Sequence, residues 1–141
     1  MRPLQTIALD LEGTLISNVV SQFPRPGLYG FLEVARRSCS RLLVFTAVRQ
    51  PLFREVAATL VAEGAAPLWF ADLECWTLAG EFKDLSLIPG VEVKHAVLID
   101  DLEAYVHPAQ RDRWIRIRQF DPLDENDLEL ARVGELLRSW R

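Results

Sequence analysis

Short apolar runs alternate along the chain with longer segments in which apolar residues recur every three or four positions. The runs predict five strands, at residues 6–9, 42–45, 68–70, 96–99 and 114–117. The second and fourth runs are apolar almost throughout, as expected for parallel strands covered on both faces. This alternation predicts an α/β fold with a mainly parallel central sheet.

Three segments carry the helical period, at residues 27–37, 51–63 and 126–140. At the start of the third, Asn126 and Glu129 resemble a capping box. Residues 72–83 have a different pattern, with two short strand-like pieces around a Gly-containing turn, and predict a small β-hairpin.

Composition narrows the class of protein. The chain has 141 residues, half of them hydrophobic, which fits one domain over residues 1–141. The net charge of −4 gives no sign of a nucleic-acid or anionic-membrane partner. No apolar stretch approaches the ~20 residues of a membrane span, and no secretory signal is visible, so we expect a cytoplasmic protein. Cys39 and Cys75 have no metal-binding spacing and are interpreted as buried or half-buried thiols.

The first strand ends in two carboxylates, Asp10 and Glu12, followed by Gly13. Ligands of parallel α/β sheets bind at the carboxyl ends of the strands. A carboxylate there can attack phosphorus, while a second acid protonates the leaving oxygen and then activates water. A polar turn that merely closes the strand explains this motif equally well when it is taken alone.

Two further positions suit a phosphate. Thr46 ends the second apolar strand shortly before a helix, where a hydroxyl and backbone N–H groups can bind an anion. Lys83 can neutralise charge that grows on a phosphoryl group. Each has an ordinary explanation in isolation, since threonine is common in strands and lysine on surfaces.

The fourth predicted strand delivers Asp100 and Asp101 to the same edge of the sheet. Neighbouring carboxylates are costly unless a cation compensates them. Mg²⁺ prefers one or two carboxylates together with waters and phosphate oxygens, so Asp10 and Asp100 suit this ion. Along the chain an acid pair, a hydroxyl, a lysine and a second acid pair follow one another. This order arises by chance less readily than any one of the four motifs alone.

These motifs resemble the haloacid dehalogenase superfamily, and within it the branch of NLI-interacting factors and carboxy-terminal-domain phosphatases. The resemblance covers residues 7–106. It rests on the runs Asp10-Leu11-Glu12-Gly13-Thr14-Leu15, Arg25-Pro26-Gly27-Leu28, Val44-Phe45-Thr46-Ala47, Lys83-Asp84-Leu85-Ser86 and Leu98-Ile99-Asp100-Asp101.

The resemblance implies a Rossmann-like three-layer α/β/α sandwich and a phosphatase that forms an aspartyl-phosphate. Asp10 is then the nucleophile and a metal ligand, and Glu12 is the general acid/base, with its backbone carbonyl touching Mg²⁺. Thr46 and Lys83 are expected to bind the phosphate. Asp100 is expected to ligate Mg²⁺, with Asp101 assisting directly or through water.

Two features bear on the substrate. The branch has aspartate where this chain has Glu12, which shifts the acid by about one bond, and enolase-phosphatases of the same superfamily carry a similar Asp-x-Glu-Gly-Thr run. Residues 15–25 and 47–82 leave no room for a cap domain, so we expect an open site. Trp76 forms a wall of that site or packs ordinarily, with Phe23 and Arg49 as other candidates for its rim.

The leading hypothesis is a Mg²⁺-dependent phosphatase acting on a phosphoprotein or another accessible phosphomonoester. One alternative is a binding module of the same fold with weak or no catalysis. Another is a small-molecule phosphatase whose lid is supplied by oligomerisation. Phosphopeptides tested against metabolite phosphates distinguish the first hypothesis from the last.

Overall fold

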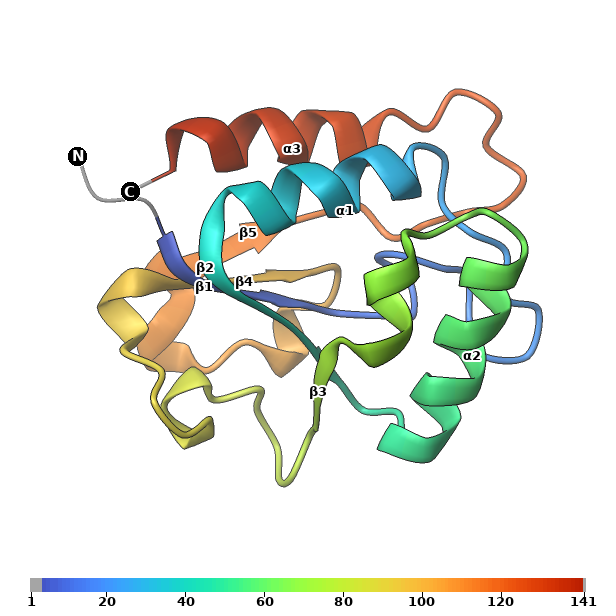
Figure 1. The fold of residues 1–141 in the computed structure, drawn as a ribbon. Coiled ribbons are helices and arrows are strands. Elements are labelled where there is room, and N and C mark those ends of the chain that lie inside the picture. The colour runs from blue at the N-terminus through green and yellow to red at the C-terminus, as the bar shows by residue number, and fades with distance from the viewer. Residues whose placement is uncertain (1–3, 141) are drawn as a thin grey trace.

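A five-stranded sheet forms the centre of the molecule, in the order β3-β2-β1-β4-β5 with every pairing parallel. The computed structural model describes residues 4–140 (Figure 1). The strands are β1 (Leu4–Leu9), β2 (Cys39–Thr46), β3 (Glu74–Thr77), β4 (Ala96–Asp100) and β5 (Trp114–Arg116). The predicted α/β fold with a parallel sheet is confirmed.

The strands bury side chains on both faces of the sheet. In β2, Leu42 and Val44 join one hydrophobic cluster, while Leu43 and Phe45 join the other. The strands β1 and β4 alternate in the same way. This double burial explains why these runs are apolar almost throughout instead of alternating with polar residues.

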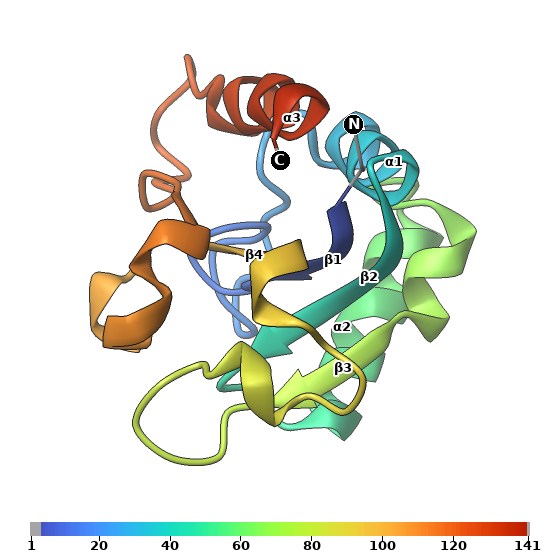
Figure 2. The same cartoon turned by 90° about the vertical axis from the view of Figure 1, so that its left-hand side faces the viewer.

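The two outer layers are built differently. The helices α1 (Leu28–Arg37), α2 (Gln50–Ala62) and α3 (Glu129–Ser139) all contribute to the larger cluster on one face. In both views α1 and α3 lie side by side (Figures 1 and 2). Short 3₁₀ helices, including η2 (Leu85–Leu87), and the loops around them cover the smaller cluster on the opposite face.

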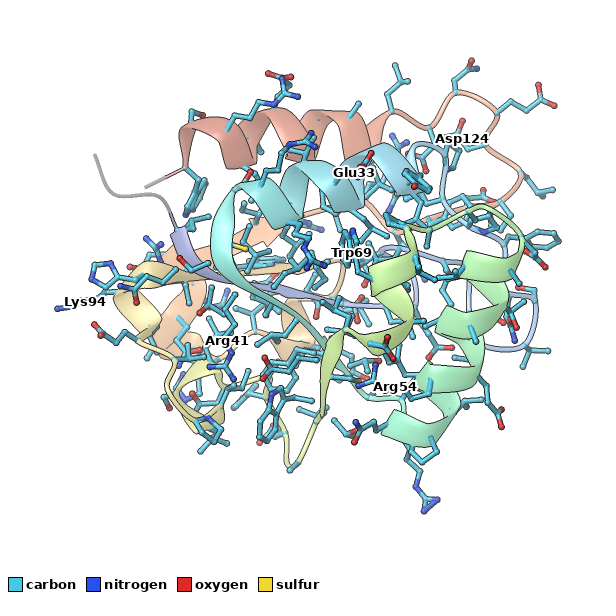
Figure 3. All side chains as sticks on the ribbon, in the orientation of Figure 1. Glu33, Arg41, Arg54, Trp69, Lys94 and Asp124 are labelled. Atoms are coloured by element: carbon cyan, nitrogen blue, oxygen red, sulfur yellow. The ribbon has the colours of Figure 1, made fainter. Side chains whose placement is uncertain are left out.

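One predicted strand, at residues 68–70, is a 3₁₀ helix instead, η1 (Leu68–Asp72). A tight helical turn buries Phe70 edge-on against Phe53 of α2 and leaves Leu68 79% exposed. Arg54, also on α2, fixes the turn by donating to the carbonyls of Ala71 and Leu73 (Figure 3). A three-residue apolar run fits either structure, and packing against α2 decides between them.

The segment predicted as a β-hairpin forms a single strand, β3, which pairs in parallel with β2. Within the described chain no second strand returns beside it. The chain instead leads to Lys83, which makes an isolated parallel bridge with Val106. The side chain of Cys75 is buried in the larger hydrophobic cluster, so β3, which is the edge strand of the sheet, packs against the main core.

The third helix begins at Glu129, later than predicted, and the expected capping box is absent. Asn126 lies in the preceding turn, where its N–H donates to Asp124. Asp127 Oδ1 instead accepts from the backbone N–H of Glu129 at 3.0 Å.

Cys39 is half-buried and Cys75 buried, and both thiols are free, as interpreted from the sequence. Across residues 4–140, the helices are too short or too polar to cross a membrane.

Candidate active site

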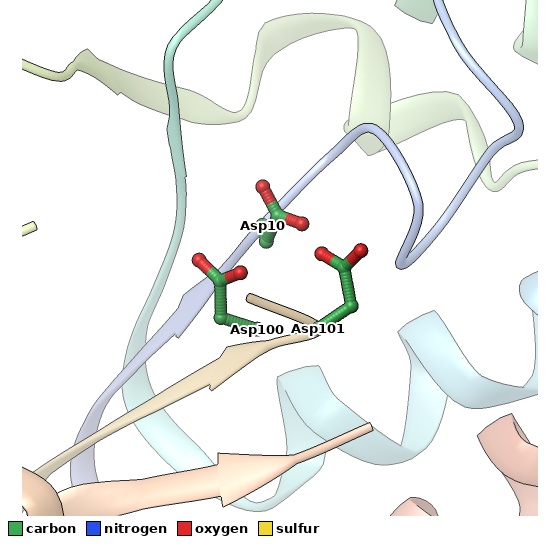
Figure 4. Close-up of side chains that lie close together, drawn as sticks. All are labelled: Asp10, Asp100 and Asp101. Atoms are coloured by element: carbon green, nitrogen blue, oxygen red, sulfur yellow. The ribbon is translucent and has the colours of Figure 1, made fainter. Parts of the chain in front are cut away.

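Three aspartates meet where β1 and β4 end. These strands are neighbours in the sheet, and the N–H of Asp10 continues their pairing by donating to the carbonyl of Ile99 at 2.9 Å. Asp10, Asp100 and Asp101 each place a carboxylate oxygen within 4.8 Å of the others (Figure 4). All three are buried. The geometry therefore brings together three of the four acids that the strand pattern predicted at this edge.

Burial makes the carboxyl groups of Asp10 and Asp100 difficult to ionise. It raises the pKa of Asp10 to about 7, although the positive charge of Lys83 opposes the shift. The pKa of Asp100 is also raised, first by burial and then by the charge of Asp10. The cluster therefore favours a bound cation, which would let the acids stay ionised together.

Lys83 supplies a positive charge within the cluster. Its Nζ lies 2.7 Å from Asp10 Oδ1 and 2.5 Å from Asp100 Oδ2, and its side chain is fully buried. Burial by itself lowers the pKa of Lys83, but the two aspartates together outweigh this effect and raise it. A backbone bond to the carbonyl of Tyr105, at 2.8 Å, fixes the segment that carries the lysine.

The loop after β1 is fitted closely around the cluster. Thr14 Oγ1 donates to Asp10 Oδ2 at 2.7 Å, so this carboxylate is oriented through both oxygens, by Thr14 and by Lys83. Gly13 has φ 81°, and a Cβ at this position would come within 2.4 Å of Asp101 Oδ2. The glycine after the acid pair is therefore required both by its backbone conformation and by space.

Glu12 lies apart from the three aspartates. Its Oε2 accepts from the backbone N–H of Val19 at 2.9 Å, so the carboxylate is turned toward the loop at residues 17–24. It is absent from the group of carboxylates that converge within 4.8 Å. The role of Glu12 as acid/base and carbonyl metal ligand stays a prediction.

Thr46 ends β2, the other neighbour of β1, so it lies at the same edge of the sheet as Asp10. It is buried, and its Oγ1 accepts from the N–H of Val48 at 3.1 Å. Within residues 4–140 its hydroxyl proton has no acceptor. That proton is available to a bound phosphate oxygen.

Arg25 supports this site by hydrogen-bonding to the loop that carries Thr14. Its guanidinium is buried and donates to the carbonyls of Gly13 and Thr14, both at 3.3 Å. It also donates to the carbonyl of Arg118 at 2.7 Å and pairs with buried Asp127 at 2.9 Å. The loop that carries Thr14 is thereby tied to the segments on either side of it.

A protein-family model decides the class of protein: the model described as NLI interacting factor-like phosphatase matches residues 5–141. The chain belongs to this family. The family is a carboxy-terminal-domain-phosphatase-like family of the haloacid dehalogenase superfamily, as the motifs suggested. Its members act on phosphorylated substrates, and membership supports phosphatase activity here. No curated protein matched the chain.

The sequence alone assigned Thr14 and Arg25 no role in the site, although the structure shows that both contact it. Both stand in runs that carry the resemblance, and that was the available signal. Trp76 is half-buried against the smaller core cluster and donates to Glu74 at 2.5 Å, in keeping with ordinary packing. Phe23 and Arg49 are exposed.

Proposed function

We propose that this protein is a Mg²⁺-dependent phosphatase that hydrolyses phosphate monoesters through an aspartyl-phosphate on Asp10. The observation that carries the proposal is the meeting of Asp10, Asp100, Asp101 and Lys83 at the carboxyl edge of the sheet, in a chain of a phosphatase family. The absence of sequence for a cap domain favours a phosphoprotein or another accessible phosphoester as the substrate.

In the first half-reaction, a carboxylate oxygen of Asp10 attacks phosphorus, and the bond from phosphorus to the ester oxygen breaks. Glu12 gives its proton to the leaving oxygen. Lys83 and Thr46 hold the phosphoryl oxygens, where negative charge must be stabilised. In the second half-reaction, Glu12 takes a proton from water, which attacks phosphorus and releases phosphate from Asp10.

The donor set suits Mg²⁺. Asp10, Asp100, Asp101 and the backbone carbonyl of Glu12 would hold the ion, and all of them are hard oxygen donors. The buried aspartates need a counter-charge beyond that of Lys83, and this need supports a metal in the cluster. When bound, the ion neutralises charge on the phosphoryl oxygens and on Asp10.

The proposal is tested by separating nucleophile from acid/base. Asp10→Asn is expected to abolish phosphoenzyme formation, because an amide is a much poorer nucleophile than a carboxylate. Glu12→Gln is expected to accumulate phosphoenzyme with an activated aryl phosphate, whose leaving group needs little protonation. Its turnover should fall by roughly 10²–10⁴-fold, the usual range for general acid–base catalysis. Intact mass measured after acid quenching detects the phosphoenzyme, and steady-state rates measure the loss of turnover.

Exposed Asp112 and Glu63 provide matched controls, because Asp112→Asn and Glu63→Gln make the same chemical changes on the surface. Both variants should retain wild-type turnover. If Glu12→Gln also does so, Glu12 has no part in the mechanism. Wild-type turnover in Asp10→Asn would overturn the aspartyl-phosphate mechanism on Asp10, and absence of turnover in the wild type would leave the binding module as the better account.

A further inference from the structure

A recess of about 590 Å³ opens beside the carboxylate cluster, between the end of β5 and the start of α3. Asp101 lines the recess and also belongs to the cluster, so the two share a wall. Arg116, Arg118 and Arg132 line it as well. In a chain with a net charge of −4, three arginines among the eight lining residues are a local concentration of basic side chains, beside the two acidic ones, Asp101 and Glu129.

Hydrogen bonds hold the framework of this arginine recess in place. The N–H of Arg118 donates to Glu129 at 2.8 Å, and its carbonyl accepts from buried Arg25. Arg132 reaches from α3 to the carbonyl of Arg116 at 3.0 Å and pairs with Glu129 at 2.6 Å. The bond from Arg132 contributes most to lowering the pKa of Glu129, to about 2, so this carboxylate stays ionised at neutral pH.

The recess keeps an excess of positive charge after its internal pairs are counted. Arg132 is balanced by Glu129, and Arg118 pairs with Asp124 on the outer loop before α3 (Figure 3). The Arg118–Asp124 pair is largely exposed, and such pairs are weak enough for a ligand to displace. Among residues 4–140, no carboxylate pairs with Arg116. Three guanidinium groups against Glu129 and Asp124 leave one positive charge. Asp101 also lines the recess, but under the proposed function its charge is compensated by the Mg²⁺ that the aspartate cluster would hold.

We propose that the arginine recess binds a second anionic group of the phosphorylated substrate, either a carboxylate or another phosphate. This inference rests on the proposed function, because the reacting phosphate must lie at Asp10 for the shared wall at Asp101 to place a second anion in the recess. Guanidinium groups suit both ligands, since their planar N–H donors match carboxylate and phosphate oxygens. Within the described chain, Arg116 is the arginine of the recess without a carboxylate partner, and its guanidinium lies over the Trp114 ring at 5.9 Å from the ring centroid.

The test compares two phosphoserine peptides of equal length, one with glutamates beside the phosphoserine and one with glutamines. With Mg²⁺ present, wild-type protein should favour the acidic peptide in kcat/KM by about fivefold, the upper range for one exposed ion pair. The preference should lie in KM and decrease at high salt, which screens exposed charges. A small phosphomonoester with and without a second phosphate forms a parallel arm, and it shows whether the second anion comes from a peptide or a small molecule.

Arg116→Gln should bring the ratio of the two kcat/KM values toward one, and Arg116→Glu should reverse it. Using the ratio cancels any common change in turnover. Arg138→Gln removes an exposed arginine at the far end of α3 and should keep the wild-type ratio. A wild-type ratio near one in both arms, or a ratio that survives in Arg116→Glu, overturns the proposal.

Failure of the proposed function would look different, because the wild type would then hydrolyse neither these substrates nor an aryl phosphate. Fluorescence anisotropy with the same labelled peptides still tests the recess in that case. Tighter binding of the acidic peptide that is lost in Arg116→Glu supports the recess. Equal binding of both peptides to the wild type contradicts it.

Discussion

At the scale of single residues, Lys83 is the cation that lets two aspartates remain together in the interior. It is fully buried and contacts both Asp10 and Asp100, whose pKa values are raised by burial. A buried ammonium is itself costly unless it is paired, so each charge in the group depends on the others. Under the proposed function, the same ammonium would contact the phosphoryl oxygens brought to Asp10.

Lys83→Met keeps most of the length of the side chain but removes the charge. We expect kcat on an aryl phosphate to fall by about 10²–10³-fold, the usual effect of removing one preorganised electrostatic donor. Lys94 is exposed, so Lys94→Met is the matched control and should retain wild-type kcat. Wild-type kcat in Lys83→Met would exclude Lys83 from binding the transferring phosphate.

The sequence predicted the positions of some of these residues better than others. Asp10, Thr46 and Asp100 each end an apolar strand, and parallel strands bring such ends to one edge. Lys83 follows no regular strand, so by itself it looked like an ordinary surface lysine, and its place in the order of motifs and the family resemblance pointed to it. The contacts of Arg25 depend on loops whose paths no local pattern determines, so its buried position could not be predicted.

At the scale of elements, Arg25 joins parts of the chain that are far apart in sequence. It contacts the loop after β1, the segment after β5 and the turn before α3. Asp127 shares in this junction, because one of its oxygens pairs with Arg25 and the other accepts from the N–H of Glu129. Active-site loop and helix start are therefore stabilised by one buried ion pair.

Asp127→Ala should lower the free energy of unfolding by about 3–5 kcal/mol, the usual cost of leaving a buried charge without its partner. Urea unfolding followed by circular dichroism measures the change. The exposed pair Arg138–Glu135 supplies the control, since Glu135→Ala should cost no more than about 1 kcal/mol. If both variants lose the same small amount, the Arg25–Asp127 pair does not stabilise the junction.

Among the secondary-structure elements, sequence patterns predicted the helices well but failed for two short segments. The helices were predicted within a few residues because each has a long apolar stripe, which packing on the sheet reinforces. Residues 68–70 and 72–83 have only short apolar runs, which suit a strand, a turn or a 3₁₀ helix equally well. Their structures are set by contacts with α2 and β2, which lie outside the local sequence.

At the scale of the whole molecule, the fold places its concentrated charge at one edge of an otherwise apolar sheet. Asp10, Asp100 and Asp101 are buried together, and Lys83 contacts the first two, so the cluster holds three carboxylates and one ammonium. Repulsion among them opposes folding of the metal-free protein. A ligand that binds only the folded state and compensates this charge should therefore stabilise the entire chain.

Mg²⁺ should raise the thermal unfolding midpoint of protein first treated with a chelator. An ion present at 100 times its Kd contributes about 2.7 kcal/mol, which corresponds to a shift of several degrees for a domain of this size. Differential scanning calorimetry across a Mg²⁺ titration measures it. Asp100→Asn should lose most of the shift because it removes a buried ligand charge, whereas Asp112→Asn on the surface should retain it. An unchanged midpoint at millimolar Mg²⁺, or an equal shift in Asp100→Asn, would show that the aspartate cluster does not bind the ion.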